Sequence, residues 1–131
     1  MKLGSLLKNK KSSFLRDKQE ALKADLNKSS IESYVSEIAF VYSEITYAIK
    51  HIRKLNKPKK VKTPLILQPG KSYIYPEPYG VALIIGPWNY PFQLVIDPLV
   101  GSIMAGNCSI IKPSELSPNT SNVIAEMLKE Y

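Results

Sequence analysis

Residues 81–118 read VALIIGPWNYPFQLVIDPLVGSIMAGNCSIIKPSELSP and decide the fold of this 131-residue chain. The stretch opens with the continuous apolar, β-branched run Val81–Gly86, which predicts a strand buried on both faces, as in a parallel sheet. Apolar side chains at helical spacing follow over Tyr90–Ala105, and Gly106 supplies a helix stop. Cys108–Ile111 predicts a second buried strand. The order strand, helix, strand is typical of an open parallel α/β sheet.

A last helix is predicted after the second strand. Ser117 suits the N-cap and Pro118 suits the first helical position. Two parallel strands do not complete a sheet, because each needs neighbours at its edges and helices on its faces. We therefore expect an unfinished sheet with an exposed strand edge and an apolar patch that faces water.

Two helices are predicted ahead of the sheet. The first covers Ser12–Leu26, with one of its two opening serines as the N-cap. The second covers Ile31–Leu55, and Ser29 with Glu32 forms a capping box at its start. One short helix is a small partner for this long apolar stripe, so we expect part of the stripe to pack on later sequence or on chain that is not here.

The connecting sequence suggests how the chain is organised. Asn56–Pro64 is basic and punctuated by prolines, which favours a linker over a helix or a central strand. Lys71–Gly80 alternates tyrosines with Ile and prolines, which favours an exposed extended segment. We expect a helical segment with its linker over 1–62, an extended arm over 63–80 and the first half of a larger domain over 81–131.

The composition excludes several protein classes. A single Cys (Cys108) and a single His (His51) rule out an intramolecular disulfide and the usual Cys/His zinc site. The sequence contains neither a signal-peptide core nor an apolar run of transmembrane length, which predicts no integral membrane segment. We expect a cytoplasmic protein without a structural metal.

The formal net charge of +7 is concentrated in residues 1–62. Such a region could meet nucleic acid or an anionic membrane. Proteins that bind single-stranded nucleic acid typically carry aromatic or glycine residues between their basic residues, and these are missing between the lysines here. We therefore favour lysines that coat the solvent-exposed face of a helix and the segment before it, and we expect no nucleic-acid partner. The lysines assigned to that face are Lys8, Lys10, Lys11, Lys18, Lys23 and Lys28.

The segments after the two strands are the candidate sites, because ligands of open α/β sheets lie beyond the carboxyl ends of the strands. After the first strand, Pro87 and Pro91 bracket Trp88 and Asn89. A rigid Asn at a helix start can donate its amide to a developing oxyanion. The alternative is a turn in which Asn89 caps the helix and Trp88 fills the core. The dinucleotide fingerprint GxGxxG is absent.

Lys112 and Glu115 follow the second strand. An acidic residue near this point is the expected acceptor for the ribose hydroxyls of a dinucleotide, and a lysine can donate to the same hydroxyls or to a 2′-phosphate. The alternative is an ion pair on a surface loop.

Taken together, four motifs resemble the aldehyde dehydrogenase superfamily, most closely its class 3 type. They are Pro78 to Gly80, GPWNYPF at 86–92, GSIMAGN at 101–107 and IIKPSELS at 110–117. The likeness extends upstream to about Phe14. It implies a Rossmann-like fold without GxGxxG, present here in part, and oxidation of aldehydes to carboxylic acids with NAD or NADP. In that reaction a cysteine thiolate attacks the aldehyde, hydride passes to NAD(P)⁺, and a glutamate-activated water hydrolyses the thioester.

The resemblance also implies residue roles and a homodimeric complete enzyme. Asn89 matches the oxyanion-hole asparagine, and Lys112 and Glu115 match the residues that hold the adenosine ribose. The loop that lines the cofactor and substrate channel is matched by Ile85, Gly86, Pro87 and Trp88.

The catalytic cysteine and glutamate of the family come after the residues present here. Cys108 is not a substitute, because we expect it at the start of a buried strand, where a thiol is inert. His51 is expected on the surface without a partner. The chain is thus predicted to be inactive alone, as the N-terminal part of such an enzyme. The alternative is a stand-alone interaction module derived from the family.

Overall fold

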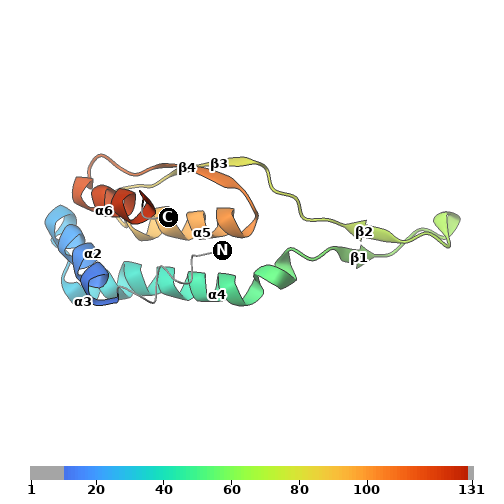
Figure 1. The fold of residues 1–131 in the computed structure, drawn as a ribbon, viewed down its shortest axis with the longest axis horizontal. Helices are drawn as coiled ribbons and strands as arrows, with labels where there is room; N and C mark the ends of the chain where they lie inside the picture. Colours follow the sequence, from blue (N-terminus) through green and yellow to red (C-terminus); the bar gives the residue numbers. More distant parts are fainter. Residues whose placement is uncertain (1–10, 130–131) are drawn as a thin grey trace.

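The structure is a computed structural model that describes residues 11–129. The chain forms helices first, then an antiparallel ribbon, then a strand, helix, strand and helix (Figure 1). In chain order the elements are α2 (Lys11–Leu26), α3 (Ser30–Ser33), the π-helical turn η1 (Tyr34–Ile38), α4 (Ala39–Leu55), β1 (Lys59–Val61), the 3₁₀ turn η2 (Leu65–Leu67), β2 (Ser72–Ile74), β3 (Val81–Ile85), α5 (Gln93–Met104), β4 (Cys108–Lys112) and α6 (Pro118–Lys129).

Strands β3 and β4 are parallel neighbours, in register from Val81 opposite Cys108 to Ile85 opposite Lys112. The predicted α/β order is therefore confirmed. The prediction that both strands are buried on both faces is wrong: Ile84 is buried, whereas Leu83 and Ile85 are exposed. Helix α5 contacts one face of the pair, and no element within residues 11–129 covers the other.

Cys108 is exposed, so the prediction of a buried thiol is also wrong. It opens β4 opposite Val81, which is itself exposed at the same end of the sheet. An apolar strand sequence predicts burial only where other elements supply the covering layers.

Strands β1 and β2 form a separate antiparallel ribbon that reaches away from the rest of the molecule (Figure 1). Residues 56–64 contain neither a helix nor a central strand, as predicted, although β1 lies inside them as one of the two strands of this ribbon. Pro58 and Pro64 flank Lys59–Val61 and leave these three residues free to pair. The exposed extended character of Lys71–Gly80 is confirmed, with Tyr79 99% exposed.

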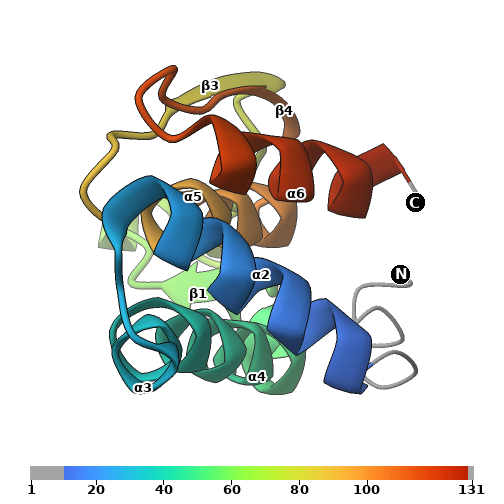
Figure 2. The same cartoon turned by 90° about the vertical axis from the view of Figure 1, so that its left-hand side faces the viewer.

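Helix α2 lies between α4 and α6, and α5 lies under the β3–β4 pair (Figure 2). The apolar stripe of the second predicted helix packs partly on α5, as expected from its length. Its first turns do not: Ile31 is 76% exposed and Val35 is 58% exposed. The core contains Ile38, Val41, Ile45, Ala48, Ile84, Phe92, Val95, Ile96, Leu99, Val100 and Ile124.

Two lysines assigned to the solvated face are buried, which corrects that assignment for them. Lys18 is 3% exposed and Lys28 is 8% exposed, whereas Lys23 is exposed as predicted. Lys8 and Lys10 lie outside the described residues. Among the described helices, none is long and apolar enough to cross a membrane.

Some of the predicted helix ends match the structure and others do not. Ser29 accepts the Glu32 N–H at 3.2 Å, which confirms its capping role. The two serines at the start of α2 lie inside the helix, so neither is its N-cap. Helix α5 begins at Gln93, three residues after the predicted Tyr90. Gly106, at φ +84°, ends α5 as predicted.

Candidate functional site

The two candidate segments meet at the carboxyl end of the β3–β4 pair. Ile85 lies opposite Lys112 in the parallel register, and the Gly86 N–H donates to the Lys112 carbonyl oxygen at 3.0 Å. The loop with Trp88 and Asn89 therefore starts beside the loop with Glu115. In the sequence, Asn89 and Lys112 are more than twenty residues apart, so it is the pairing of the two strands that brings them together.

Gly86 is buried where β3 turns toward α5. A Cβ added to Gly86 would lie 2.2 Å from Val95 Cγ2, well inside van der Waals contact. Only glycine lets the loop pass so close to α5 without moving a core side chain. This contact sets where residues 87–92 leave the sheet.

The loop that follows is exposed along its outer face. Trp88 is 51% exposed, so the alternative in which it fills the core is wrong. Asn89 does not cap α5 either. The Glu37 carboxylate accepts the N–H groups at the start of that helix, from Phe92 at 2.9 Å and Gln93 at 3.2 Å. The Asn89 side chain is thus left for another role.

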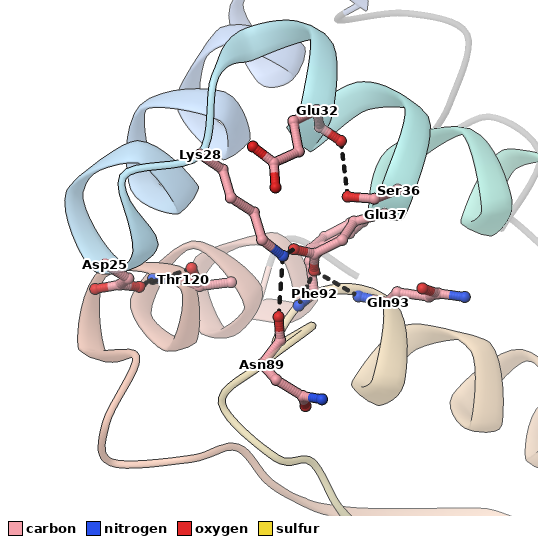
Figure 3. Close-up of polar contacts among 9 residues, drawn as sticks. All are labelled: Asp25, Lys28, Glu32, Ser36, Glu37, Asn89, Phe92, Gln93 and Thr120. Carbon is pink, nitrogen blue, oxygen red and sulfur yellow. Dashed lines mark hydrogen bonds and ion pairs between the residues drawn. The ribbon is translucent and has the colours of Figure 1, made fainter.

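A buried ion pair lies behind this loop (Figure 3). Lys28 Nζ is 2.5 Å from Glu37 Oε1, and their side chains are 9% and 0% exposed. Lys28 Nζ also donates to the Asn89 backbone oxygen at 3.0 Å and lies 4.2 Å from the centroid of the Tyr90 ring. Figure 3 shows the Asn89 amide pointing away from this pair, on the far side of its own backbone.

Sequence reasoning missed this pair, although one signal was available. Glu37 stands three residues after Tyr34 and four before Val41, so it lies on the apolar stripe of its helix. A carboxylate on a core-facing stripe needs a buried partner. The sequence did not indicate that the partners would be Lys28 and the start of α5.

Lys112 and Glu115 form an ion pair of 2.6 Å on the adjoining loop. Both side chains are exposed, at 52% and 79%. The hydrogen bond from Lys112 holds the pKa of the Glu115 carboxyl below its ordinary value. The pair thus presents an ammonium and an ionised carboxylate together, at the strand end where β4 stops.

The remaining chemical candidates lie elsewhere. Cys108 is at the opposite end of the five-residue strand β4 from Lys112, about 13 Å away along an extended chain. His51 was expected to have no partner, but its ring stacks on Tyr47 with centroids 4.1 Å apart, and Nδ1 is 2.9 Å from the Tyr47 carbonyl oxygen. That contact is local to α4.

Comparison with known proteins identifies the family. The model of the aldehyde dehydrogenase family matches residues 1–131. The chain belongs to the aldehyde dehydrogenase family. It is 50% identical over 129 residues to a 4,4′-diaponeurosporen-aldehyde dehydrogenase of Staphylococcus aureus, which covers 98% of this chain and 27% of that protein. It is 48% identical over 124 residues to aldehyde dehydrogenase family 3 member B1 of Rattus norvegicus, covering 92% of this chain and 26% of the relative.

Solved aldehyde dehydrogenases share this fold. A substrate-bound state of the Staphylococcus aureus enzyme AldH superposes with a TM-score of 0.91 at 50% identity, over 98% of this chain and 27% of that one. A succinic semialdehyde dehydrogenase from Streptococcus pyogenes, solved with NADP⁺, superposes with a TM-score of 0.77 at 18% identity, over 96% of this chain and 26% of that one. The chain spans about a quarter of the length of these relatives. The predicted resemblance and the incomplete α/β fold are both confirmed.

Proposed function

We propose that this chain is the N-terminal part of an NAD(P)-dependent aldehyde dehydrogenase that oxidises aldehydes to carboxylic acids through a cysteine thioester. Residues 81–131 then contribute the first half of the cofactor-binding domain. The observation that carries the proposal is the meeting of two loops at one end of the β3–β4 pair. One loop bears the outward-pointing amide of Asn89 and the other bears the ion pair of Lys112 and Glu115.

Asn89 is the proposed oxyanion donor. Attack of a thiolate on an aldehyde carbonyl places negative charge on the carbonyl oxygen, and a fixed amide N–H stabilises this charge more than it stabilises the neutral substrate. The two prolines that bracket the loop, together with the buried contacts behind it, hold the backbone of Asn89 in place. The backbone from which the amide projects is therefore held before the reaction starts.

Lys112 and Glu115 are the proposed ribose-binding residues. A vicinal diol can donate to an ionised carboxylate and accept from an ammonium, and these two groups lie 2.6 Å apart on an exposed loop. The pair present in this chain fits a nucleotide ribose on that ground. When bound, the nicotinamide supplies the hydride acceptor of the reaction. Ile85, Gly86, Pro87 and Trp88 would line the same channel.

Cys108 is not the proposed nucleophile. It opens β4 at the end of the sheet opposite the Asn89 loop. We therefore expect the 131-residue chain alone to produce no NAD(P)H from NAD(P)⁺ and a panel of aliphatic and aromatic aldehydes. Turnover that Cys108→Ser abolishes would contradict this assignment.

A chimera tests the positive part of the proposal. Residues 1–131 replace the matching segment of the Staphylococcus aureus relative, and NAD(P)H formation is followed. Asn89→Ala in this chimera is expected to lower kcat by about 10²- to 10³-fold. Asn122→Ala, which removes an exposed asparagine on α6, is the matched control and is expected to change little. Equal rates for the two variants would contradict the oxyanion role.

The exposed arm supports a further part of the proposal, a homodimer of the complete enzyme. Leu65 and Ile66 at the turn of the arm are 89% and 91% exposed. Exposed apolar groups of this kind mark interaction surfaces, and the occupant proposed here is a second copy of the complete enzyme. Sedimentation of the chimera is expected to show a dimer that the L65N/I66N variant weakens. The control Lys23→Asn, at an exposed polar position on α2, is expected to leave the dimer intact, and a dimer unaffected by L65N/I66N would contradict the role of the arm.

A further inference from the structure

Lys28 and Glu37 connect the N-terminal helices to the loop that carries Asn89. Lys28 lies between α2 and α3, Glu37 lies in η1, and the loop lies more than fifty residues later in the chain. Both side chains are buried, so water does not compete for their contacts. The pair reaches the loop from behind, on the side opposite to the Asn89 amide (Figure 3).

The two carboxylate oxygens of Glu37 serve different partners. Oε1 faces Lys28 Nζ at 2.5 Å, and Oε2 accepts the N–H groups of Phe92 and Gln93 at 2.9 and 3.2 Å. Phe92 occupies the N-cap position of α5 and has no side-chain cap of its own. A carboxylate at this position satisfies free amide groups and complements the positive end of the helix. Glu37 thereby fixes the downstream end of the loop.

Lys28 fixes the upstream end. Its ammonium donates to the Asn89 carbonyl oxygen at 3.0 Å and lies 4.2 Å from the centroid of the Tyr90 ring. Holding the carbonyl of a residue determines the plane of the following peptide, and with it the direction in which the side chain leaves the backbone. The ion pair therefore fixes both ends of the segment 89–93 at once.

We propose that Lys28 and Glu37 are positioning residues that orient the Asn89 amide toward the reacting oxygen. This inference rests on the proposed function, in which Asn89 stabilises the oxyanion. An amide displaced by about 1 Å loses much of its effect on the transition state, while substrate binding elsewhere is unchanged. Loss of the pair should accordingly lower kcat and leave the KM values for aldehyde and cofactor nearly unchanged.

A purely structural role predicts a different result. Replacing a buried ion pair by neutral side chains of similar shape is often neutral for stability, whereas removing one charge alone leaves the other buried without compensation. The double variant K28M/E37Q removes both charges and keeps an amide oxygen that can still accept the α5 N–H groups. It is expected to fold, and it lacks the Lys28 ammonium that donates to the Asn89 carbonyl oxygen.

The chimera with the Staphylococcus aureus relative allows the test. Steady-state kinetics are combined with ¹⁹F NMR of enzyme labelled with fluorotryptophan, because Trp88 adjoins Asn89 and is the only Trp of this chain. Its resonance is assigned by its loss in Trp88→Phe. K28M/E37Q is expected to lower kcat by about 10- to 100-fold and to shift or broaden the Trp88 resonance. The control R16M/E20Q removes an exposed ion pair of 3.4 Å on α2 and should change neither.

Each outcome decides the inference. A folded K28M/E37Q enzyme with an unchanged kcat and Trp88 resonance overturns it. If circular dichroism shows that this variant is unfolded, Lys28→Met decides instead: the Glu37 carboxylate loses its cation there, but the N–H groups of Phe92 and Gln93 still compensate part of its charge. Unfolding of both variants also overturns the inference, since the pair then serves the fold rather than the loop. A normal kcat in Asn89→Ala would refute the proposed function instead, and the Trp88 resonance would still report whether the pair holds the loop.

Discussion

The carboxylate of Asp25 accepts two hydrogen bonds of 2.7 Å from Thr120, one from its amide N–H and one from its hydroxyl. It also accepts the Asn119 N–H at 3.1 Å. Ser117 stands at the predicted N-cap position before Pro118, and its carbonyl oxygen accepts the Ser121 N–H at 3.0 Å, but its hydroxyl donates to the Ser114 carbonyl oxygen at 3.4 Å. The end of α2 therefore caps the start of α6 across the molecule.

Loss of this cap should destabilise the protein. Asp25→Ala is expected to lower the free energy of unfolding by about 1–2 kcal/mol, since the amide groups of Asn119 and Thr120 lose their acceptor. Asp17→Ala, at an exposed position of the same helix, is the control. Urea unfolding of the chimera measures the free energy of unfolding of both variants. Equal losses in Asp25→Ala and Asp17→Ala would show that Asp25 does not cap α6.

The same contact predicts a dependence on acid. Partial burial raises the pKa of Asp25, but hydrogen bonds from Thr120 and Asn119 outweigh it and hold the pKa below its ordinary value of 3.8. Because the folded-state pKa is depressed, this stabilisation is complete above the ordinary value and is lost as the pH falls through the lowered one. Asp25→Asn should therefore show a shallower loss of stability below about pH 4 than the parent. An identical acid profile would contradict this.

Gly86 offers a second test, because its space is occupied by Val95. A Cβ at Gly86 would lie 2.2 Å from Val95 Cγ2. Gly86→Ala is expected to cost about 1–3 kcal/mol of stability through overpacking. The double variant G86A/V95A should recover part of this loss, which a double-mutant cycle detects as favourable coupling.

Gly101 is the matched control for that substitution. It lies within α5, and a Cβ there would meet nothing within 4 Å. Gly101→Ala should therefore be neutral or stabilising by up to about 1 kcal/mol, because alanine favours helix over glycine. Similar destabilisation at both glycines would show that the contact with Val95 is not the cause.

The elements that could be predicted from the sequence are those with local signals. The β-branched run of β3, the glycine stop at Gly106 and the Ser29 cap each depend on residues within one element. The start of α5 was placed too early because its cap, Glu37, comes from another helix. Local periodicity likewise cannot show that Lys18 and Lys28 are buried, since Lys18 packs on Phe92 and Lys28 contacts Asn89, both far away in sequence.

The candidate site shows the same division. The motifs around Asn89 and Lys112 were visible in the sequence, and parallel pairing of β3 with β4 brings them together as expected. Of the ion pair behind Asn89, only Glu37 gave a signal, through its place on an apolar stripe, because the contacts with Asn89 and Phe92 join segments more than fifty residues apart. The exposure of Cys108 was missed for a related reason: strand burial depends on which elements cover the sheet.

The pair of Lys112 and Glu115 should matter for cofactor binding rather than for stability. Both side chains are exposed, so solvent screens their ion pair and it is expected to contribute little to folding. If they hold the ribose hydroxyls, Lys112→Ala and Glu115→Gln should each weaken NAD⁺ or NADP⁺ binding to the chimera by about tenfold or more. Titration calorimetry with both nucleotides measures this effect.

Glu126→Gln, an exposed carboxylate on α6, is the control for charge. It is expected to leave the affinity unchanged. Binding to the chimera that tolerates both Lys112→Ala and Glu115→Gln would place the ribose elsewhere. The isolated 131-residue chain is expected to bind either nucleotide weakly, because this pair addresses only one part of it.

Lys18 provides the last test, through the pH dependence of stability. Its side chain is almost fully buried, with Nζ 4.7 Å from the centroid of the Phe92 ring and 5.8 Å from that of Tyr42. Burial lowers the pKa of Lys18 from 10.5 to about 8. Burial and the neighbouring Tyr34 raise the pKa of Tyr42, so this phenol stays protonated between pH 7 and 9.5.

Between about pH 8 and 10.5 the unfolded chain holds a proton that the folded protein has released from Lys18. The free energy of unfolding should therefore rise with pH in this window, by up to about 1.4 kcal/mol per pH unit from this group. Lys18→Met is expected to abolish the rise, whereas Lys23→Met, at an exposed position on α2, should retain it. Urea unfolding of the chimera at pH 7, 8, 9 and 9.5 separates the two variants. A rise of the same slope in Lys18→Met would show that another group causes it, because no protonation change at position 18 is then available.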